Sequence, residues 1–163
     1  MFGGAEPAPH VLSGHSLRQI RRSARTLLVF YTALLASLCL RLMFPDHATL
    51  GATLPRGDAL QSFVLEILLT CLLMFVILSV STGAKEKGIT AGIAVGSVIG
   101  LEALFAGPIS GASMNPVRSL APAVVSLQFT SLWVYLTAPT LGAVIAVFGC
   151  RCVHERPCCC PDN

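Results

Sequence analysis

The chain alternates long apolar stretches with shorter polar ones, and this pattern predicts four membrane-spanning helices. The apolar stretches cover residues 27–44, 61–82, 89–106 and 132–150. Each is close to the roughly 20 residues that a helix needs to cross a bilayer. Turn-forming residues fill the polar connection at 45–60, so the first two spans should lie antiparallel. The spans predict one transmembrane domain over residues 27–150, between a polar basic tail at 1–26 and a cysteine-rich tail at 151–163.

The segment between the third and fourth spans predicts a different kind of element. Glycines and a proline between residues 107 and 111 should interrupt regular structure. Asn115 followed by Pro116 then supplies a favoured N-cap and a favoured first helical residue. The helix expected over residues 115–125 is too short to cross a bilayer. Irregular backbone at membrane depth is tolerated only where it is buried in protein or lines a water-filled cavity, so we predict a re-entrant half-helix beside a pore.

Composition and charge place this domain in a lipid membrane and suggest its orientation. Hydrophobic residues make up 54% and charged residues 12% of the chain, which is too apolar for a soluble domain. The basic residues of the N-terminal tail, Lys85 with Lys87, and Arg151 with Arg156 fall on one side of the predicted topology. The positive-inside rule assigns that side to the cytoplasm, so we expect a multi-pass protein of the plasma membrane or an endomembrane with both termini cytoplasmic.

The net charge and the residue types of the chain argue against several other functions. A net charge of +3 is too small to indicate a nucleic-acid partner. The sequence offers no activated nucleophile, catalytic carboxylate pair or metal-ligand set, so we expect neither an enzyme nor a cofactor or metal. In the cysteine-dense tail, Cys150 and Cys152 are candidates for palmitoylation. Metal binding by adjacent cysteines is a weaker alternative, and a tail altered by an exon or reading-frame change is the interpretation that we prefer.

Two polar features of the spans have positions that call for partners. Glu66 lies one turn inside the second span, where a carboxyl is either functional or a brace for nearby backbone amides. Trp133 and Tyr135 begin the fourth span, where aromatic residues typically mark the membrane interface.

The segment G-P-I-S-G-A-S-M-N-P-V-R-S-L-A-P-A at 107–123 resembles the second half of a major intrinsic protein, the aquaporin and aquaglyceroporin family. Within that family it is most similar to the plant nodulin-26-like intrinsic proteins. The resemblance extends through residues 60–80, 91–97 and 132–143. It implies an all-α, aquaporin-like membrane fold truncated to about four transmembrane helices and one re-entrant half-helix. Because the family pattern has six spans and two half-helices, the chain looks like spans three to six of it.

The resemblance implies a passive transmembrane channel for water and small uncharged solutes such as glycerol, urea and metalloid acids. Its implied partners are membrane lipid and aquaporin-family proteins, with which it would form a homo- or hetero-tetramer. The alternative is a non-conducting truncated relative that at most associates with full-length channels. The residues that match the family's pore are Asn115, Pro116, Val117, Arg118, Ala112, Ala103 and Gly111.

Physical properties of these residues agree with such a pore. Asn115 should present amide donors where the half-helix dipole is positive, and Arg118 should point into the same channel. The backbone from 107 to 114 should offer carbonyl acceptors. The resemblance places Ala103, Ala112 and Arg118 at the outer constriction, which the two alanines would make wide and weakly polar.

Two glutamates have different expected roles. Glu66 matches a residue that braces the re-entrant loop in the family. Glu102 matches no family residue that we identify, and one hypothesis is that it pairs with Arg118 and mutes the positive charge of the constriction. Burial without a function is the alternative for Glu102.

Overall fold

A computed structural model describes residues 14–83 and 89–153, and every regular element within them is a helix. The helices are α1 (Gly14–Met43), α2 (Ala59–Gly83), α3 (Ile89–Ser110), α4 (Pro116–Ser126) and α5 (Leu132–Val153). Four of them, α1, α2, α3 and α5, are long and apolar enough to cross a membrane, whereas α4 has only 11 residues. The predicted fold class, four spans with one half-helix, is thereby confirmed.

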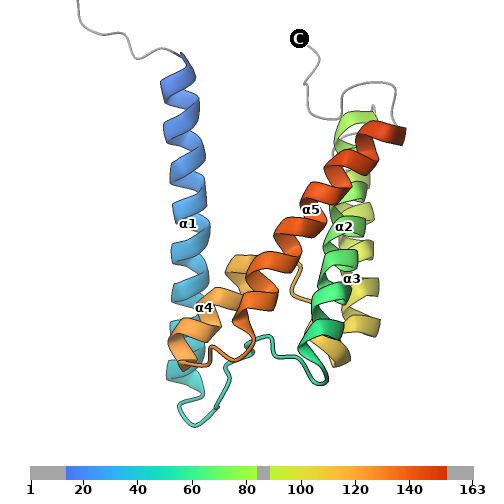
Figure 1. The fold of residues 1–163 in the computed structure, drawn as a ribbon. Helices are drawn as coiled ribbons and strands as arrows, with labels where there is room; N and C mark the ends of the chain where they lie inside the picture. The colour runs from blue at the N-terminus through green and yellow to red at the C-terminus, as the bar shows by residue number, and fades with distance from the viewer. Residues whose placement is uncertain (1–13, 84–88, 154–163) are drawn as a thin grey trace, which may run out of the picture.

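Helix α2 is the centre of a three-helix group, because it packs against both α3 and α5 (Figure 1). The crossing of α2 and α5 is close at Gly142. A Cβ atom built on Gly142 would lie only 2.5 Å from the carbonyl oxygen of Ile67. No larger residue fits there without moving the backbone, so Gly142 sets the distance between the two helices.

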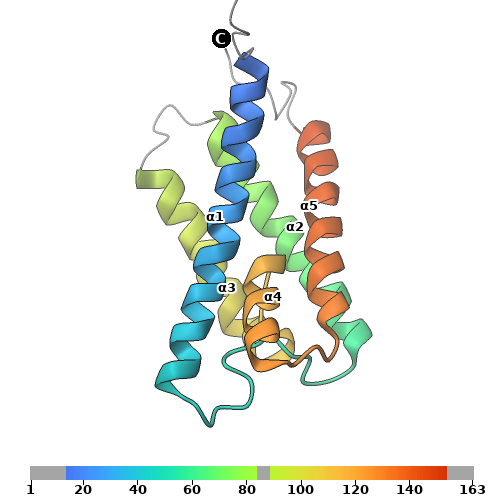
Figure 2. The ribbon, with the colours of Figure 1, turned by 90° about the vertical axis from the view of Figure 1, so that its left-hand side faces the viewer.

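The short helix α4 connects this group to α1. Among the helices of the described chain, α4 contacts α5 and α1, and α1 contacts α4 alone (Figures 1 and 2). Arg41 strengthens the contact, because its Nη2 donates a hydrogen bond to the carbonyl oxygen of Val125 at the end of α4. The half-helix is therefore held between two long helices.

Two helix boundaries differ clearly from the sequence predictions. The first helix starts at Gly14, so residues 14–26 of the expected polar tail are helical. Its Leu, Arg, Gln and Ala residues favour helix, which explains the extension. The expected break at Gly107 and Pro108 is wrong, because α3 continues to Ser110 with Pro108 in its last turns. The irregular segment begins only at Gly111, whose φ of +87° favours glycine.

Candidate functional site

The half-helix α4 starts and ends with clear capping structures. Asn115 has an extended backbone, and its Oδ1 accepts a hydrogen bond of 2.9 Å from the N–H of Val117. Pro116 occupies the first helical turn, where its missing N–H costs nothing. Leu127 closes the helix in the left-handed conformation. Since Oδ1 of Asn115 accepts the capping bond, its Nδ2 group is the part that remains to donate to a solute.

The backbone that leads into α4 has an unusual course. Gly111, Ala112 and Met114 all have positive φ angles, of 87°, 43° and 53°. A non-glycine residue in this region costs on the order of 1–3 kcal/mol, so the surroundings must hold the segment in place. The segment also leaves backbone N–H groups outside any helix, and these need acceptors.

Glu66 supplies these acceptors. Its Oε1 accepts hydrogen bonds from the hydroxyl of Ser110 at 2.8 Å and from the N–H of Ser113 at 2.9 Å. Its Oε2 accepts from the N–H of Met114 at 2.9 Å. The side chain is 0% exposed, so the three charge-assisted bonds offset the cost of burying the carboxylate. Glu66 thus has the contacts that a brace of the re-entrant segment requires.

A chain of hydroxyl groups holds the other side of the segment. Thr53 donates to the Oγ of Ser119 at 2.6 Å, and Ser113 donates to the carbonyl oxygen of Asn115 at 2.9 Å. The Ser113 and Ser119 hydroxyls are 2.5 Å apart. Because each hydroxyl has one hydrogen and that of Ser113 is already used, Ser119 must donate to Ser113. The donors therefore run in one direction, from Thr53 to Asn115.

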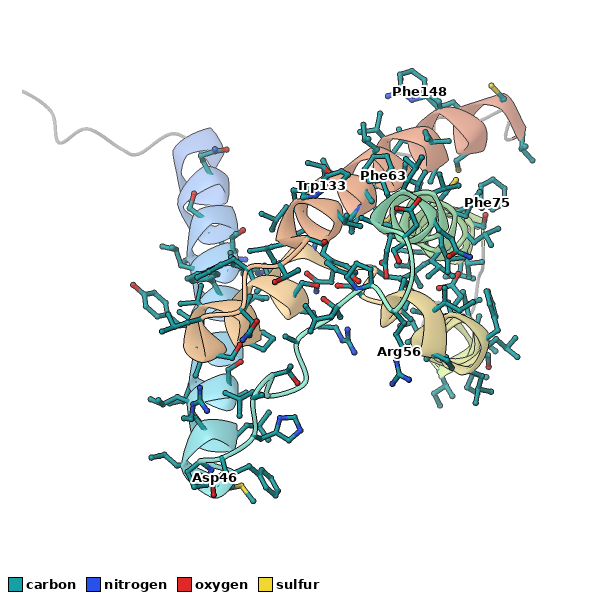
Figure 3. The ribbon with its side chains drawn as sticks, turned by 60° about the horizontal axis from the view of Figure 1, so that its bottom comes forward. Asp46, Arg56, Phe63, Phe75, Trp133 and Phe148 are labelled. Atoms are coloured by element: carbon teal, nitrogen blue, oxygen red, sulfur yellow. The ribbon has the colours of Figure 1, made fainter. Side chains whose placement is uncertain are left out.

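Tyr135 closes this network from α5. Its hydroxyl donates to the carbonyl oxygen of Ser110 at 2.6 Å, and the residue is 0% exposed. Tyr135 therefore lies inside the protein, and its position at the level of the membrane interface stays a prediction. Trp133, two residues earlier, is 52% exposed and contacts the ring of Phe63 (Figure 3). Sequence reasoning missed the roles of Thr53, Ser119 and Tyr135, although polar groups in apolar surroundings are a signal that partners exist.

A cavity of about 760 Å³ lies beside the start of α4. Five of the residues expected in the pore line it, namely Ala103, Ala112, Asn115, Pro116 and Arg118. The remaining wall comes mainly from α2 and α5. The structure does not place Val117 or Gly111 on this lining.

Arg118 lies in the cavity with its charge only partly engaged. Its Nη1 donates to the carbonyl oxygen of Gly111 at 3.3 Å, and the side chain is exposed. This bond ties the first turn of α4 back to the start of the irregular segment. The stretch of backbone acceptors is shorter than predicted, because residues 107–110 are helical and only 111–115 are irregular.

The expected pairing of Glu102 with Arg118 is absent among the described residues. Both carboxylate oxygens of Glu102 are buried without a hydrogen-bond partner. Glu102 lies within electrostatic range of Glu66 instead. The reason is helical geometry: Ala103 lines the cavity, and its neighbour in the helix points about 100° away from that direction.

The two candidate lipidation residues, both near the end of α5, differ in their exposure. Cys150 is buried, whereas Cys152 is exposed. Palmitoylation of either residue stays a prediction. Lys85, Lys87 and Arg156, on which part of the topology argument depends, and the cysteines at 158–160 lie outside the described residues.

The fold and the site together define an integral, multi-pass membrane protein with a polar, re-entrant half-helix. The family model described as Major intrinsic protein matches residues 19–149. The chain belongs to the major intrinsic protein family. Since this is a family of channels, the prediction that the chain is not an enzyme is confirmed.

Similar proteins come from plants and agree with the resemblance to nodulin-26-like proteins. Aquaporin NIP1-4 of Oryza sativa subsp. japonica is 54% identical over 109 residues, which cover 66% of this chain and 40% of that protein. Aquaporin NIP1-1 of Zea mays is 54% identical over 113 residues, covering 69% and 40%. Nodulin-26 of Glycine max is 47% identical over 113 residues, covering 69% and 42%. The chain thus spans about two-fifths of the length of these relatives.

Proposed function

We propose that the chain forms part of a channel for water and small uncharged solutes. The observation that carries this proposal is that Asn115 and Arg118 line one cavity at the N-terminal end of α4. The helix dipole places partial positive charge at that end. A water or hydroxyl oxygen accepts hydrogen bonds there, whereas a cation is repelled. The names of the aquaporin relatives support the same class of solute.

The size of the side chains at the cavity suggests the solutes. Ala103 and Ala112 leave room beside Arg118, and the lining is mostly apolar. We propose that small polyols such as glycerol, urea and undissociated metalloid acids pass as well as water. The orientation with both termini in the cytoplasm and the assembly into a tetramer are part of this proposal.

A second function is supported by the position of α1. Because α1 packs only against α4 among the described helices, most of its apolar surface stays exposed. Such a surface suits contact with helices of another chain. On this alternative the chain does not conduct by itself and associates with full-length family members, whose assembly it alters.

Flux into liposomes separates the two functions. The purified chain is reconstituted, and glycerol and water entry are followed by stopped-flow light scattering. We expect flux above that of empty liposomes, and loss of the excess in Asn115→Asp, which replaces the amide donors by a charge. Gln128→Glu is the matched control, because it makes the same change at an exposed residue between α4 and α5.

The same experiment has an outcome that would reject conduction. Flux equal to that of empty liposomes, from a chain that circular dichroism shows to be helical, would reject independent conduction. The alternative then requires that the chain co-purify with a full-length relative such as Nodulin-26 of Glycine max and change its flux. Equal loss of flux in Asn115→Asp and Gln128→Glu would reject the role of Asn115.

A further inference from the structure

We propose that the N-terminal turns of α1 form a binding site for anionic phospholipids at the membrane surface. The first observation is length. Helix α1 has 30 residues, which makes it about 45 Å long at 1.5 Å per residue. Its apolar part, Ser23–Met43, accounts for about 30 Å, the thickness of the hydrocarbon core. Residues 14–22 therefore extend about 13 Å beyond it. Figures 1 and 2 show this end of α1 standing beyond the ends of α2, α3 and α5.

The second observation is that the arginines of this extension share one face with Arg25, which lies just inside the apolar part. At 100° per residue, four arginine positions fall within an arc of about 100°. They are Arg18, Arg21, Arg22 and Arg25. The covered side of the helix, marked by buried Ser37 and by Arg41, lies about 130° away around the axis. The arginine face is thus turned away from α4.

The third observation concerns the residues that continue this face of α1 toward the bilayer centre. Val29 and Ala36 lie on it within the same leaflet and are exposed. A phospholipid beside α1 would therefore place its acyl chains along these apolar residues and its phosphate at the level of the arginines. This continuity favours a lipid over a free phosphate ion.

The fourth observation is that the two described arginines of this face, Arg21 and Arg25, lack partners within the described chain. Arg41 donates to the carbonyl oxygens of Pro45, His47 and Val125, and Arg118 donates to that of Gly111. By contrast, the exposed Arg21 and Arg25 have no hydrogen bond or ion pair within the described chain, and α1 contains no acidic residue.

Electrostatics makes an external anion favourable at this place. Like charges four residues apart on a helix repel each other, as Arg21 and Arg25 do. A phosphate group relieves this cost, and it also matches the planar guanidinium as a bidentate acceptor.

Binding of lipids to the full chain tests the proposal. The protein is purified in a neutral detergent and titrated with dioleoyl phosphatidylserine or dioleoyl phosphatidylcholine, and retained lipid is counted by native mass spectrometry. We expect preference for phosphatidylserine. A basic residue near an anionic surface contributes a free energy equivalent to about a fivefold change in affinity. Arg25→Gln should therefore weaken phosphatidylserine binding about fivefold, and Arg21→Gln with Arg25→Gln about 25-fold.

Two controls keep the test decisive. Arg56→Gln removes one exposed charge in the connection between α1 and α2, beside α3 and away from α1 (Figure 3), and should leave binding unchanged. Arg21→Lys with Arg25→Lys keeps the charge and should retain most of the affinity. Equal binding of the two lipids, or equal weakening by lysine and glutamine, would overturn the proposal. Competition by soluble glycerophosphoserine as strong as that by the intact lipid would show a site for phosphate alone and reject the lipid assignment.

Discussion

Two glutamates on neighbouring helices have nearly the same burial and opposite surroundings. Glu66 of α2 is 0% exposed and accepts three hydrogen bonds from the re-entrant segment and its neighbour Ser110. Glu102 of α3 is 3% exposed, and neither of its oxygens has a hydrogen-bond partner in the described structure. Burial of an acid inside a membrane span therefore does not by itself indicate a role. The groups around the acid decide it.

The backbone beside each carboxylate explains the difference. Within a helix every N–H group after the first turn already donates to a carbonyl, so a side chain that lies against a helix finds no free donor. Residues 111–115 are irregular, and two of their N–H groups, those of Ser113 and Met114, reach Glu66. Glu102 lies in the middle of α3, where the adjacent backbone is satisfied. The re-entrant segment and its brace thus depend on each other.

The largest effect should come from removing the brace. Glu66→Ala leaves the N–H groups of Ser113 and Met114 without acceptors, and at about 1–3 kcal/mol for each such group we expect a loss of about 2–6 kcal/mol in the free energy of unfolding. Unfolding in mixed micelles of sodium dodecyl sulfate measures the loss, and amide hydrogen exchange should accelerate at residues 113 and 114 first. Glu66→Gln keeps one acceptor oxygen and should lose less. A Glu66→Ala protein as stable as the parent would remove the distinction between the two glutamates.

The second prediction is a gain in the free energy of unfolding instead of a loss. Glu102→Met replaces an unpartnered buried carboxyl by an apolar side chain of similar size, which should raise the free energy of unfolding by about 1–3 kcal/mol. Leu101→Met is the control, because Leu101 is exposed on the same helix. A loss of stability in Glu102→Met, measured in the same micelles, would reveal a partner for this carboxyl.

The sequence predicted those parts of the molecule that are set locally. Long apolar runs specify spans, and Asn115 with Pro116 specifies a helix start, whatever the rest of the chain does. It did not predict the end of α3, because proline and glycine favour a break, while contacts such as that of Tyr135 with Ser110 accompany a longer helix. The sequence also did not show which way the side chain of Glu102 points, since a shift of one residue along a helix turns a side chain by about 100°.

The third prediction concerns the hydroxyl chain on the far side of the same segment. Thr53→Val keeps the shape of the side chain but removes the donor to Ser119, and we expect a loss of about 1–2 kcal/mol in the free energy of unfolding. Thr53→Ser keeps the hydroxyl and should retain most of the stability. A loss of stability in Thr53→Ser with none in Thr53→Val would mean that the methyl group, and not the hydrogen bond, is what matters at Thr53.

The smallest effect should come from the neutral hydrogen bond at the end of α3. Ser110 is the last residue of α3, so its carbonyl oxygen has no partner within the helix and accepts from the hydroxyl of Tyr135 instead. Tyr135→Phe leaves the ring in place, creates no cavity and removes one neutral bond, which should lower the free energy of unfolding by about 1 kcal/mol. Tyr31→Phe makes the same change on α1, where the side chain is 63% exposed, and should have no measurable effect. Equal effects of the two substitutions would mean that the Ser110 carbonyl finds another donor, and that the network around Glu66 holds the segment without help from α5.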